Sequence, residues 1–317
     1  QMEKAMVHGI SRTMPANLIL LMVGGITGTW MHSGIIPTMI YYGLDVISAQ
    51  WLLITSCLLC ALVSICIGSS WTTIATIGIA LIGIGNALGV PSPITAGAII
   101  SGSYFGDKVS PLSDTTTLAA TSAGTDLFTH IKYMLNTTIP SMGITLLIFI
   151  ILGFWYGHND EVNITEYTEG LERTFHISLW TLLVPLFTGL LIAKKVPALI
   201  TLFLSSIAAG ICALVLQQDV LLRIIGENDG TMMNFIKSLM ITYSGETNLD
   251  TGNASLNTLV ATRGMAGMLN TIWLILCAMC FGGVMVASGM LHSLTNILLK
   301  FIHNTFGLVT STVFTGF

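Results

Sequence analysis

Charged side chains are scarce in this sequence. Lys, Arg, Asp and Glu make up 8% of the 317 residues, whereas soluble domains carry about 25%. Hydrophobic residues make up 53%, and the mean hydropathy is +0.83. This composition excludes a soluble enzyme. It predicts an all-α polytopic protein of the cytoplasmic (inner) membrane, because a spanning helix needs about 20 mostly apolar residues.

Clustered cysteines and clustered basic residues are also missing. The six cysteines all lie in apolar runs, and none has metal-ligand spacing with histidine, so we interpret them as small packing residues. The 11 Lys and Arg residues are scattered, which excludes a nucleic-acid surface. We therefore expect no enzymatic activity, no nucleic-acid partner and no cofactor beyond transported ions.

The chain has neither an initiator methionine nor a signal peptide at Gln1. It ends at Phe317 inside an apolar run, without a cap, a charge or a turn. We expect a fragment of a longer chain, with further spanning segments after residue 317 and before residue 1.

Long apolar runs predict the spans and the polar segments between them. The first run, 16–48, is interrupted by several glycines and a proline, so we expect it to bend or break. The acidic stretch 157–173 is expected to be an outside loop, and Lys194-Lys195 an inside turn. Further spans are expected at 51–68, 131–156, 175–193, 196–216 and 271–299.

The chain also repeats itself weakly. A shift of 255 residues places His8–Leu62 on Arg263–Phe317, with shared pairs such as Ser33-Gly34 and Ser288-Gly289. Repeats of this kind are typical of secondary transporters. We predict a first repeat at 1–156, connecting spans and loops at 157–256, and the start of a truncated second repeat at 257–317.

Two polar interruptions fall inside apolar sequence. Ser69, Ser70, Thr72 and Thr73 precede the short apolar run 74–88, which predicts a re-entrant hairpin, with a plain turn as the alternative. Apolar segments 94–105 and 118–124 flank a second polar stretch. That pattern predicts a discontinuous helix with unwound backbone in its middle.

The second interruption, Gly102–Thr117, is the most informative feature. A charge at bilayer depth costs about 2.5–3.5 kcal/mol, so the buried carboxylates are expected to have a function. Gly102 and Gly106 would let the backbone turn, and Pro111 would break the helix. The predicted ion-binding and proton-exchanging residues are Asp107, Asp114, Ser110, Ser113, Thr115 and Thr116.

This residue set suits exchange of a cation for a proton. Sodium is expected at Asp114, Ser113 and Thr115, because carboxylate, hydroxyl and backbone oxygens replace its water. A bound cation favours the ionised carboxylate and expels its proton, and two adjacent carboxylates titrate as a pair. The alternative is a surface loop in which Ser113 or Asp114 caps the next helix.

Supporting roles are expected for Lys108, for His32 and for the hydroxyls of residues 69–73. Lys108 would neutralise an aspartate when no cation is bound. His32 lies deep in the first run, where it is either a proton relay or substrate contact, or a packed, hydrogen-bonded side chain.

The sequence resembles the NhaC-type sodium/proton antiporters, a family that includes malate/lactate antiporters. The likeness rests on Gly106–Thr116, on Ser33–Pro37 with Tyr41–Gly43, on Gly68–Thr72, and on Thr262–Met265 with the run 273–283. It implies inverted repeats, re-entrant hairpins and elevator-like movement. It also implies that Ser113–Thr116 are unwound and that Ser69–Thr73 form a hairpin tip.

We therefore predict a secondary active transporter that exchanges Na⁺ for H⁺. The alternative is Na⁺-coupled exchange of small carboxylates such as malate and lactate, received by Lys108, His32 or helix N-termini. A channel or a membrane scaffold would be a different class. The expected partners are small ions, small organic anions in the alternative, and the lipid bilayer, with a homodimer as the assembly to test.

Overall fold

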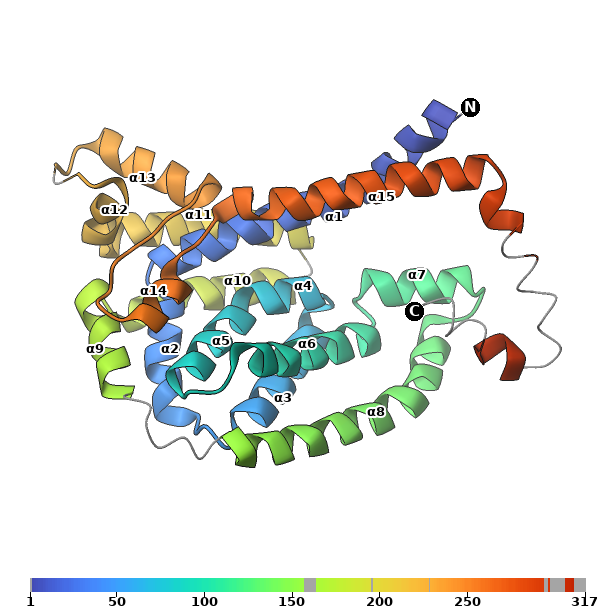
Figure 1. Cartoon of the computed structure of the whole chain (residues 1–317), viewed down its shortest axis with the longest axis horizontal. Helices are drawn as coiled ribbons and strands as arrows, with labels where there is room; N and C mark the ends of the chain where they lie inside the picture. The colour runs from blue at the N-terminus through green and yellow to red at the C-terminus, as the bar shows by residue number, and fades with distance from the viewer. Residues whose placement is uncertain are drawn as a thin grey trace. The chain divides into compact units, whose positions relative to one another are not determined.

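The computed structural model describes residues 2–156, 164–194, 196–227, 229–293, 296 and 306–310, and the described elements are helices apart from one isolated bridge, Thr247 with Thr262. Figure 1 shows them coloured along the chain. In order they are α1 (Met2–His32), α2 (Ile35–Val46), α3 (Leu52–Ile67), α4 (Ser70–Thr73), the π-helix η1 (Ile74–Gly78), α5 (Ile79–Ala87), α6 (Ser92–Val109), α7 (Asp114–Ser122), α8 (Leu127–Tyr156), α9 (Ile164–Thr174), the 3-10 helix η2 (Leu179–Leu182), α10 (Leu183–Ala193), α11 (Ala198–Leu216), α12 (Gln218–Ile225), α13 (Met232–Ser244), α14 (Ala254–Val260), the 3-10 helix η3 (Gly264–Met268) and α15 (Leu269–Ala287).

Several of these helices are long and apolar enough to cross a bilayer. Within the described residues there are five, namely Met2–His32, Ser70–Ala87, Leu127–Tyr156, Ala198–Leu216 and Gly264–Ala287. A sixth arises if Thr165–Thr174 and Leu179–Ala193, which meet at an angle of 84°, form one broken span. The predicted all-α polytopic architecture is confirmed.

The chain divides into two compact units, residues 1–20 with 268–317, and residues 21–267. In the smaller unit, α15 packs directly on the first part of α1. A Cβ atom added to Gly9 would lie 2.8 Å from the Met279 carbonyl oxygen, and one on Gly283 would lie 2.7 Å from that of Ala5. Small residues thus allow the two backbones to approach closely, as in membrane helix pairs.

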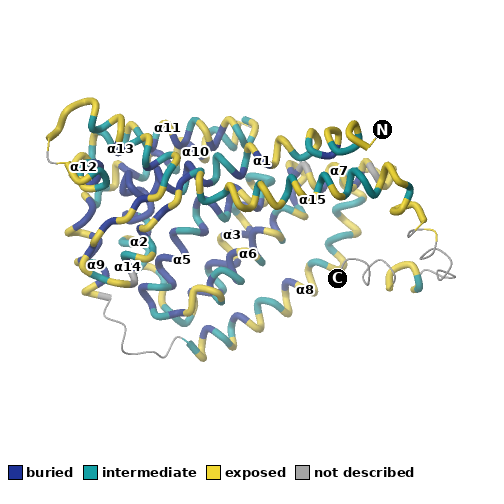
Figure 2. Tube along the Cα trace, turned by 45° about the horizontal axis from the view of Figure 1, so that its top comes forward, coloured by how far each residue is buried: buried dark blue, intermediate teal, exposed yellow. Residues whose placement is uncertain are grey.

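The core of the larger unit is the pairing of α3 with α6. Gly102 and Gly106 face the α3 backbone, and a Cβ on either would overlap the carbonyl oxygen of Cys57 or Ala61. The prediction that these glycines let the chain turn is wrong, because both lie inside helix α6. Figure 2 shows buried residues along α3, α5 and α6 and mostly exposed ones along α8. The exposed apolar surface of α8 is what a lipid-facing helix requires.

The apolar run 16–48 is interrupted between α1 and α2. Helix α1 runs unbroken through Gly24, Gly25 and Gly28, where we expected bends, and ends at His32. Gly34 follows with φ of +78°, a backbone conformation that side chains disfavour. Glycine therefore breaks this helix only where the backbone turns left-handed.

Two segments outside the expected spans are partly helical. The acidic stretch 157–173, expected to be a loop, contains α9, although residues 157–163 lie outside the described part of the chain. Residues 217–230, which follow the expected span 196–216, contain α12. Both helices have one strongly polar face, which the search for apolar runs does not detect.

The proposed repeat has a local counterpart in the backbone. Ser33 N donates to Thr29 O at 2.9 Å, and Ser288 N donates to Val284 O at 2.9 Å, 255 positions later. The following glycines, Gly34 and Gly289, have φ of +78° and +76°. Eight described glycines have a positive φ, so two similar helix ends leave the repeat a prediction. Residue 296 and residues 306–310 are the described part of the chain after 293, and the predicted repeat boundaries remain predictions.

Candidate functional site

The polar stretch after α6 is a short helix break. Helix α6 ends at Val109 and α7 begins at Asp114, so the unwound residues are Ser110–Ser113, with Pro111 among them. Ser113 caps α7, because its Oγ accepts a hydrogen bond from Thr116 N at 3.4 Å. The discontinuous helix is confirmed. The expectation that Asp114, Thr115 and Thr116 are unwound is wrong, since they form the first turn of α7.

A hairpin turn docks against this break. Helix α3 ends at Ile67, its C-cap Gly68 has φ of +73°, and Ser69 caps the next helix. A Cβ on Gly68 would lie 2.6 Å from the Leu112 carbonyl carbon, so only glycine allows this contact. The run Ser70–Ala87 is continuous and long enough to span, which makes it longer than the short apolar run that the sequence predicts.

Asp107 connects the hairpin turn to the break. Its Oδ2 accepts a hydrogen bond from Ser70 Oγ at 2.9 Å, and its Oδ1 accepts one from Ser113 Oγ at 2.7 Å. Ser113 Oγ also lies 2.8 Å from Thr115 Oγ1. The carboxylate, half-buried in the last turn of α6, is thus surrounded by hydroxyl groups from two segments distant in sequence.

Further hydroxyls tie the backbone around Asp107. Thr116 Oγ1 donates to the carbonyl oxygens of Asp107 at 3.1 Å and Lys108 at 3.0 Å. Ser110 Oγ donates to Ile65 O at 2.8 Å. These bonds satisfy carbonyl groups that a helix C-terminus leaves free. They hold the end of α6 against the end of α3.

The oxygen atoms gathered around Asp107 are of the kinds that bind sodium. Oxygen atoms of a carboxylate, of serine and threonine hydroxyls and of backbone carbonyls meet at the break, as cation sites in broken helices require. The C-terminal end of α6 carries partial negative charge, which also favours a cation. In the described chain, no group of three or more His, Cys, Asp or Glu residues is arranged to hold a metal ion.

Not every predicted residue joins this network. Lys108 is exposed, and among the described residues it forms no salt bridge, so it does not neutralise Asp107 in this structure. Thr72 and Thr73 bond to Ser69 within the hairpin turn, and Ser70 is the member of that group that reaches Asp107. The backbone of Asp114 begins α7, but its side chain lies outside the described atoms.

His32 belongs to a different region. It is fully buried at the end of α1, and its Nδ1 lies 2.9 Å from Gly28 O. None of its hydrogen bonds among the described residues reaches the Asp107 network.

Ser64 was not among the residues predicted from the sequence. Its Oγ donates to Ser103 O at 2.7 Å, between α3 and α6 and one helical turn before Asp107. A lone serine in an apolar helix, facing the Gly102 and Gly106 side of another, would have been the signal.

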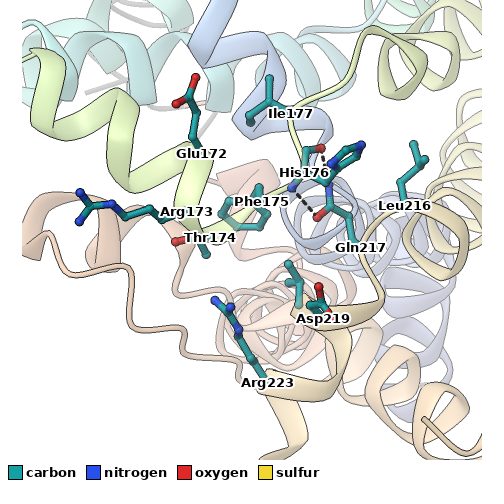
Figure 3. A pocket seen from close by; sticks show the side chains of 11 residues that line it. Glu172, Arg173, Thr174, Phe175, His176, Ile177, Leu216, Gln217, Asp219 and Arg223 are labelled. Atoms are coloured by element: carbon teal, nitrogen blue, oxygen red, sulfur yellow. Dashed lines mark hydrogen bonds between the residues drawn. The ribbon is translucent and has the colours of Figure 1, made fainter. Parts of the chain in front are cut away.

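A polar pocket lies elsewhere in the larger unit, between the α9–η2 linker and the α11–α12 junction (Figure 3). It has a volume of about 360 Å³. Buried Gln217 holds it together, because its Oε1 accepts from His176 N at 3.0 Å and its Nε2 donates to His176 O at 2.8 Å. Its charged lining residues are Glu172, Arg173, Asp219 and Arg223, and none of them was among the predicted site residues.

Known proteins resemble this chain over nearly its whole length. The model of the Na⁺/H⁺ antiporter family matches residues 1–116 and 102–317. The chain is 35% identical over 318 residues to the malate-2H(+)/Na(+)-lactate antiporter of Bacillus subtilis, with 100% of this chain and 65% of that protein covered. It is 34% identical over 311 residues to the Na(+)/H(+) antiporter NhaC of Alkalihalophilus pseudofirmus, with 98% and 64% covered.

A third relative, the arginine/ornithine antiporter ArcD of Halobacterium salinarum, is 34% identical over 307 residues, with 94% of this chain and 60% of that protein covered. No solved structure matches. The chain spans just under two thirds of the length of these relatives. The predicted resemblance is confirmed, and this multi-pass membrane protein belongs to the Na⁺/H⁺ antiporter family.

Proposed function

We propose that the whole protein is a secondary active transporter that exchanges Na⁺ for H⁺ across the cytoplasmic membrane, with Asp107 as the exchanging carboxylate. One observation carries this proposal. The Asp107 carboxylate lies between Ser70 of the hairpin turn and Ser113 of the helix break, each within 2.9 Å. A surface loop that merely caps a helix does not need a carboxylate held from both sides.

The exchange follows from competition for one group. Without a cation, the serine hydroxyls donate to the ionised carboxylate. When Na⁺ binds, those hydroxyls rotate and offer lone pairs, which their free torsion allows. A proton on the carboxylate removes the charge that attracts Na⁺. Each ligand therefore weakens the other by the same factor, as linkage requires.

Asp114 is the second proposed carboxylate, because it directly follows Ser113 in the chain. The proposal gives the two carboxylates a shared role, in which either can hold the proton that Na⁺ displaces.

The decisive test is Na⁺-driven proton flux by the full-length protein in proteoliposomes. Asp107→Asn keeps the shape of the side chain but removes its charge, and we expect it to abolish the flux. Asp126→Asn is the matched control, because Asp126 is exposed and bonds to the nearby Phe128 and Thr129 amides. Flux at the wild-type level in Asp107→Asn would overturn the proposal.

A second candidate function is Na⁺-coupled exchange of small carboxylates, and the polar pocket favours it. Guanidinium groups pair with carboxylates through two parallel hydrogen bonds. Arg173 already pairs with Glu169 at 3.0 Å, whereas Arg223 forms no salt bridge with any described residue. The relatives named for malate, lactate, arginine and ornithine also transport carboxylate compounds.

Adding malate or lactate to the same proteoliposomes separates the two functions. Flux that appears only with an organic anion, and that Arg223→Gln abolishes, would establish the second function. Arg223→Lys keeps the charge without the paired donors, and we expect it to retain part of the flux. Full flux with sodium alone would leave the pocket without a part in transport.

A further inference from the structure

One face of α1 packs directly against the backbone of two other segments of the chain. Gly24, Gly28 and His32 are spaced by four residues and therefore share a face. A Cβ on Gly24 would overlap the Gly264 carbonyl oxygen, and one on Gly28 would overlap that of Thr242. The end of α13 and the start of η3 thus lie directly on a candidate membrane span.

The chain that covers this face is partly unwound. Thr247 and Thr262 lie outside helices and pair across a single bridge, with N–H to O distances of 2.8 and 3.1 Å. Both are buried, and their hydroxyl oxygens are 2.8 Å apart. Irregular backbone packed on a spanning helix is tolerated where it is enclosed by protein or lines a polar site.

His32 lies on the same face, and its ring nitrogen Nε2 makes no hydrogen bond with a described residue. Its side chain is 0% exposed, and its Nδ1 lies 2.9 Å from Gly28 O. A carbonyl only accepts, so Nδ1 carries the hydrogen, and Nε2 of the neutral ring is a bare acceptor. Nε2 has no hydrogen-bond partner among the described residues, and neither has the buried hydroxyl of Thr242. Each unmade bond of this kind costs about 1–3 kcal/mol.

We infer that His32 Nε2 is a second proton-carrying group of this transporter, apart from Asp107. This inference rests on the proposed Na⁺/H⁺ exchange. Proton uptake turns the neutral imidazole into an imidazolium, while the Nδ1 hydrogen bond to Gly28 stays intact. The ring then carries one positive charge, which leaves with the proton on release.

The surroundings support reversible uptake rather than a fixed charge. His32 is the last residue of the 31-residue helix α1, and the C-terminal end of a helix favours a positive charge. Burial opposes that charge. The titratable groups on the covering elements are Tyr243, bonded to Ser206 at 2.6 Å, and Cys212, 4.0 Å from Ser33 O. The covering elements also carry the exposed Glu246–Arg263 pair, at 3.4 Å, and the exposed residues Lys237 and Asp250. This set holds no buried carboxylate to trap the proton.

The test is the number of protons moved per sodium ion, measured from the reversal potential of the full-length protein in proteoliposomes. We expect His32→Gln to transport sodium with one proton fewer per cycle than the wild type, and the exposed His8→Gln to keep the wild-type ratio. An unchanged ratio in an active His32→Gln would overturn the inference and leave the exchange at Asp107 standing. A wild type without sodium-driven flux would overturn the proposed function itself.

A direct measurement covers the case in which His32→Gln does not fold. In wild-type protein with ¹⁵N-labelled histidine, the His32 Nε2 resonance should change from an unprotonated to a protonated nitrogen within the pH range of transport. A nitrogen that stays unprotonated over this whole range would also overturn the inference.

Discussion

Two helix breaks of the larger unit are built differently. The serine break, Ser110–Ser113, contains a proline, and hydroxyls at and around it contact the Asp107 carboxylate and nearby carbonyls. The glycine break, Ser33-Gly34, depends on a left-handed glycine, and the ring nitrogen Nε2 of the preceding His32 has no hydrogen-bond partner in the part of the chain that the structure describes. A break rich in short hydroxyl side chains supplies oxygen ligands. At the glycine break the turning residue has no side chain, and the one hydroxyl, Ser33 Oγ, already donates to Trp30 O at 3.3 Å, so the unused polar atom there belongs to the residue before the break.

This difference suggests a division of labour. The serine break has the oxygen atoms that a metal cation needs, and the glycine break has a nitrogen that binds a proton but is a poor ligand for sodium. Both breaks depend on close backbone packing, at Gly68 and Gly102 for the first and at Gly28 for the second. Substitutions that disturb one break and spare the other test whether the roles are separate.

The largest effect is expected at Gly102. A methyl group there would overlap the Cys57 backbone, which cannot move like a flexible side chain. Overpacking of a well-packed core costs about 1–3 kcal/mol, and contact with backbone belongs at the upper end. Gly102→Ala should therefore separate α3 from α6, lower the melting temperature and abolish sodium-driven flux.

Gly97→Ala is its control on the same helix, because a Cβ on Gly97 meets nothing within 4 Å. It should leave melting temperature and flux near wild type. Similar losses in both variants would mean that α6 does not tolerate alanine for reasons unrelated to α3, and the packing argument for the serine break would fail.

The next largest effect is expected at Ser113, the hydroxyl closest to Asp107. Ser113→Ala removes a 2.7 Å hydrogen bond to a charged group and the cap of α7. Bonds to charged groups contribute about 1.5–3 kcal/mol. We expect the sodium concentration for half-maximal flux to rise about 10- to 100-fold, measured in proteoliposomes.

Ser101→Ala is the matched change, since Ser101 Oγ bonds only to Gly97 O within α6 among its described hydrogen bonds. Its sodium dependence should stay at the wild-type value. If Ser113→Ala lost stability but kept its sodium affinity, Ser113 would be a helix cap and no ligand of the cation.

The serine break could be predicted from the sequence, but the tertiary contacts around it could not. Pro111 and the run of hydroxyls predict a discontinuous helix, and carboxylates in apolar sequence predict a functional site. The sequence does not reveal that Ser70, 37 positions earlier, reaches Asp107, because that contact depends on tertiary packing. Nor does it distinguish glycines that turn the chain, such as Gly68, from those that allow close packing, such as Gly102.

The glycine break was harder to predict for a related reason. The run 16–48 offers several glycines as break points, and local propensity does not choose between them. The structure places the break at Gly34, where the chain turns against buried Gln217, while Gly24 and Gly28 stay helical against neighbouring backbone. The choice therefore depends on partners more than 170 positions away.

The smallest effect, and the most specific to the glycine break, is expected at Gly34. Its φ of +78° makes alanine unfavourable by about 1–2 kcal/mol, and a Cβ would also overlap Gln217 Nε2. Gly124 has φ of +65° but open space around it, so Gly124→Ala should lose only the stability that the unfavourable backbone conformation costs. Thermal unfolding of the purified protein should show the larger loss for Gly34→Ala. Equal losses would show that Gln217 does not restrain the break. The extra loss should shrink when Gln217 is also replaced by alanine, because residues in contact are not additive.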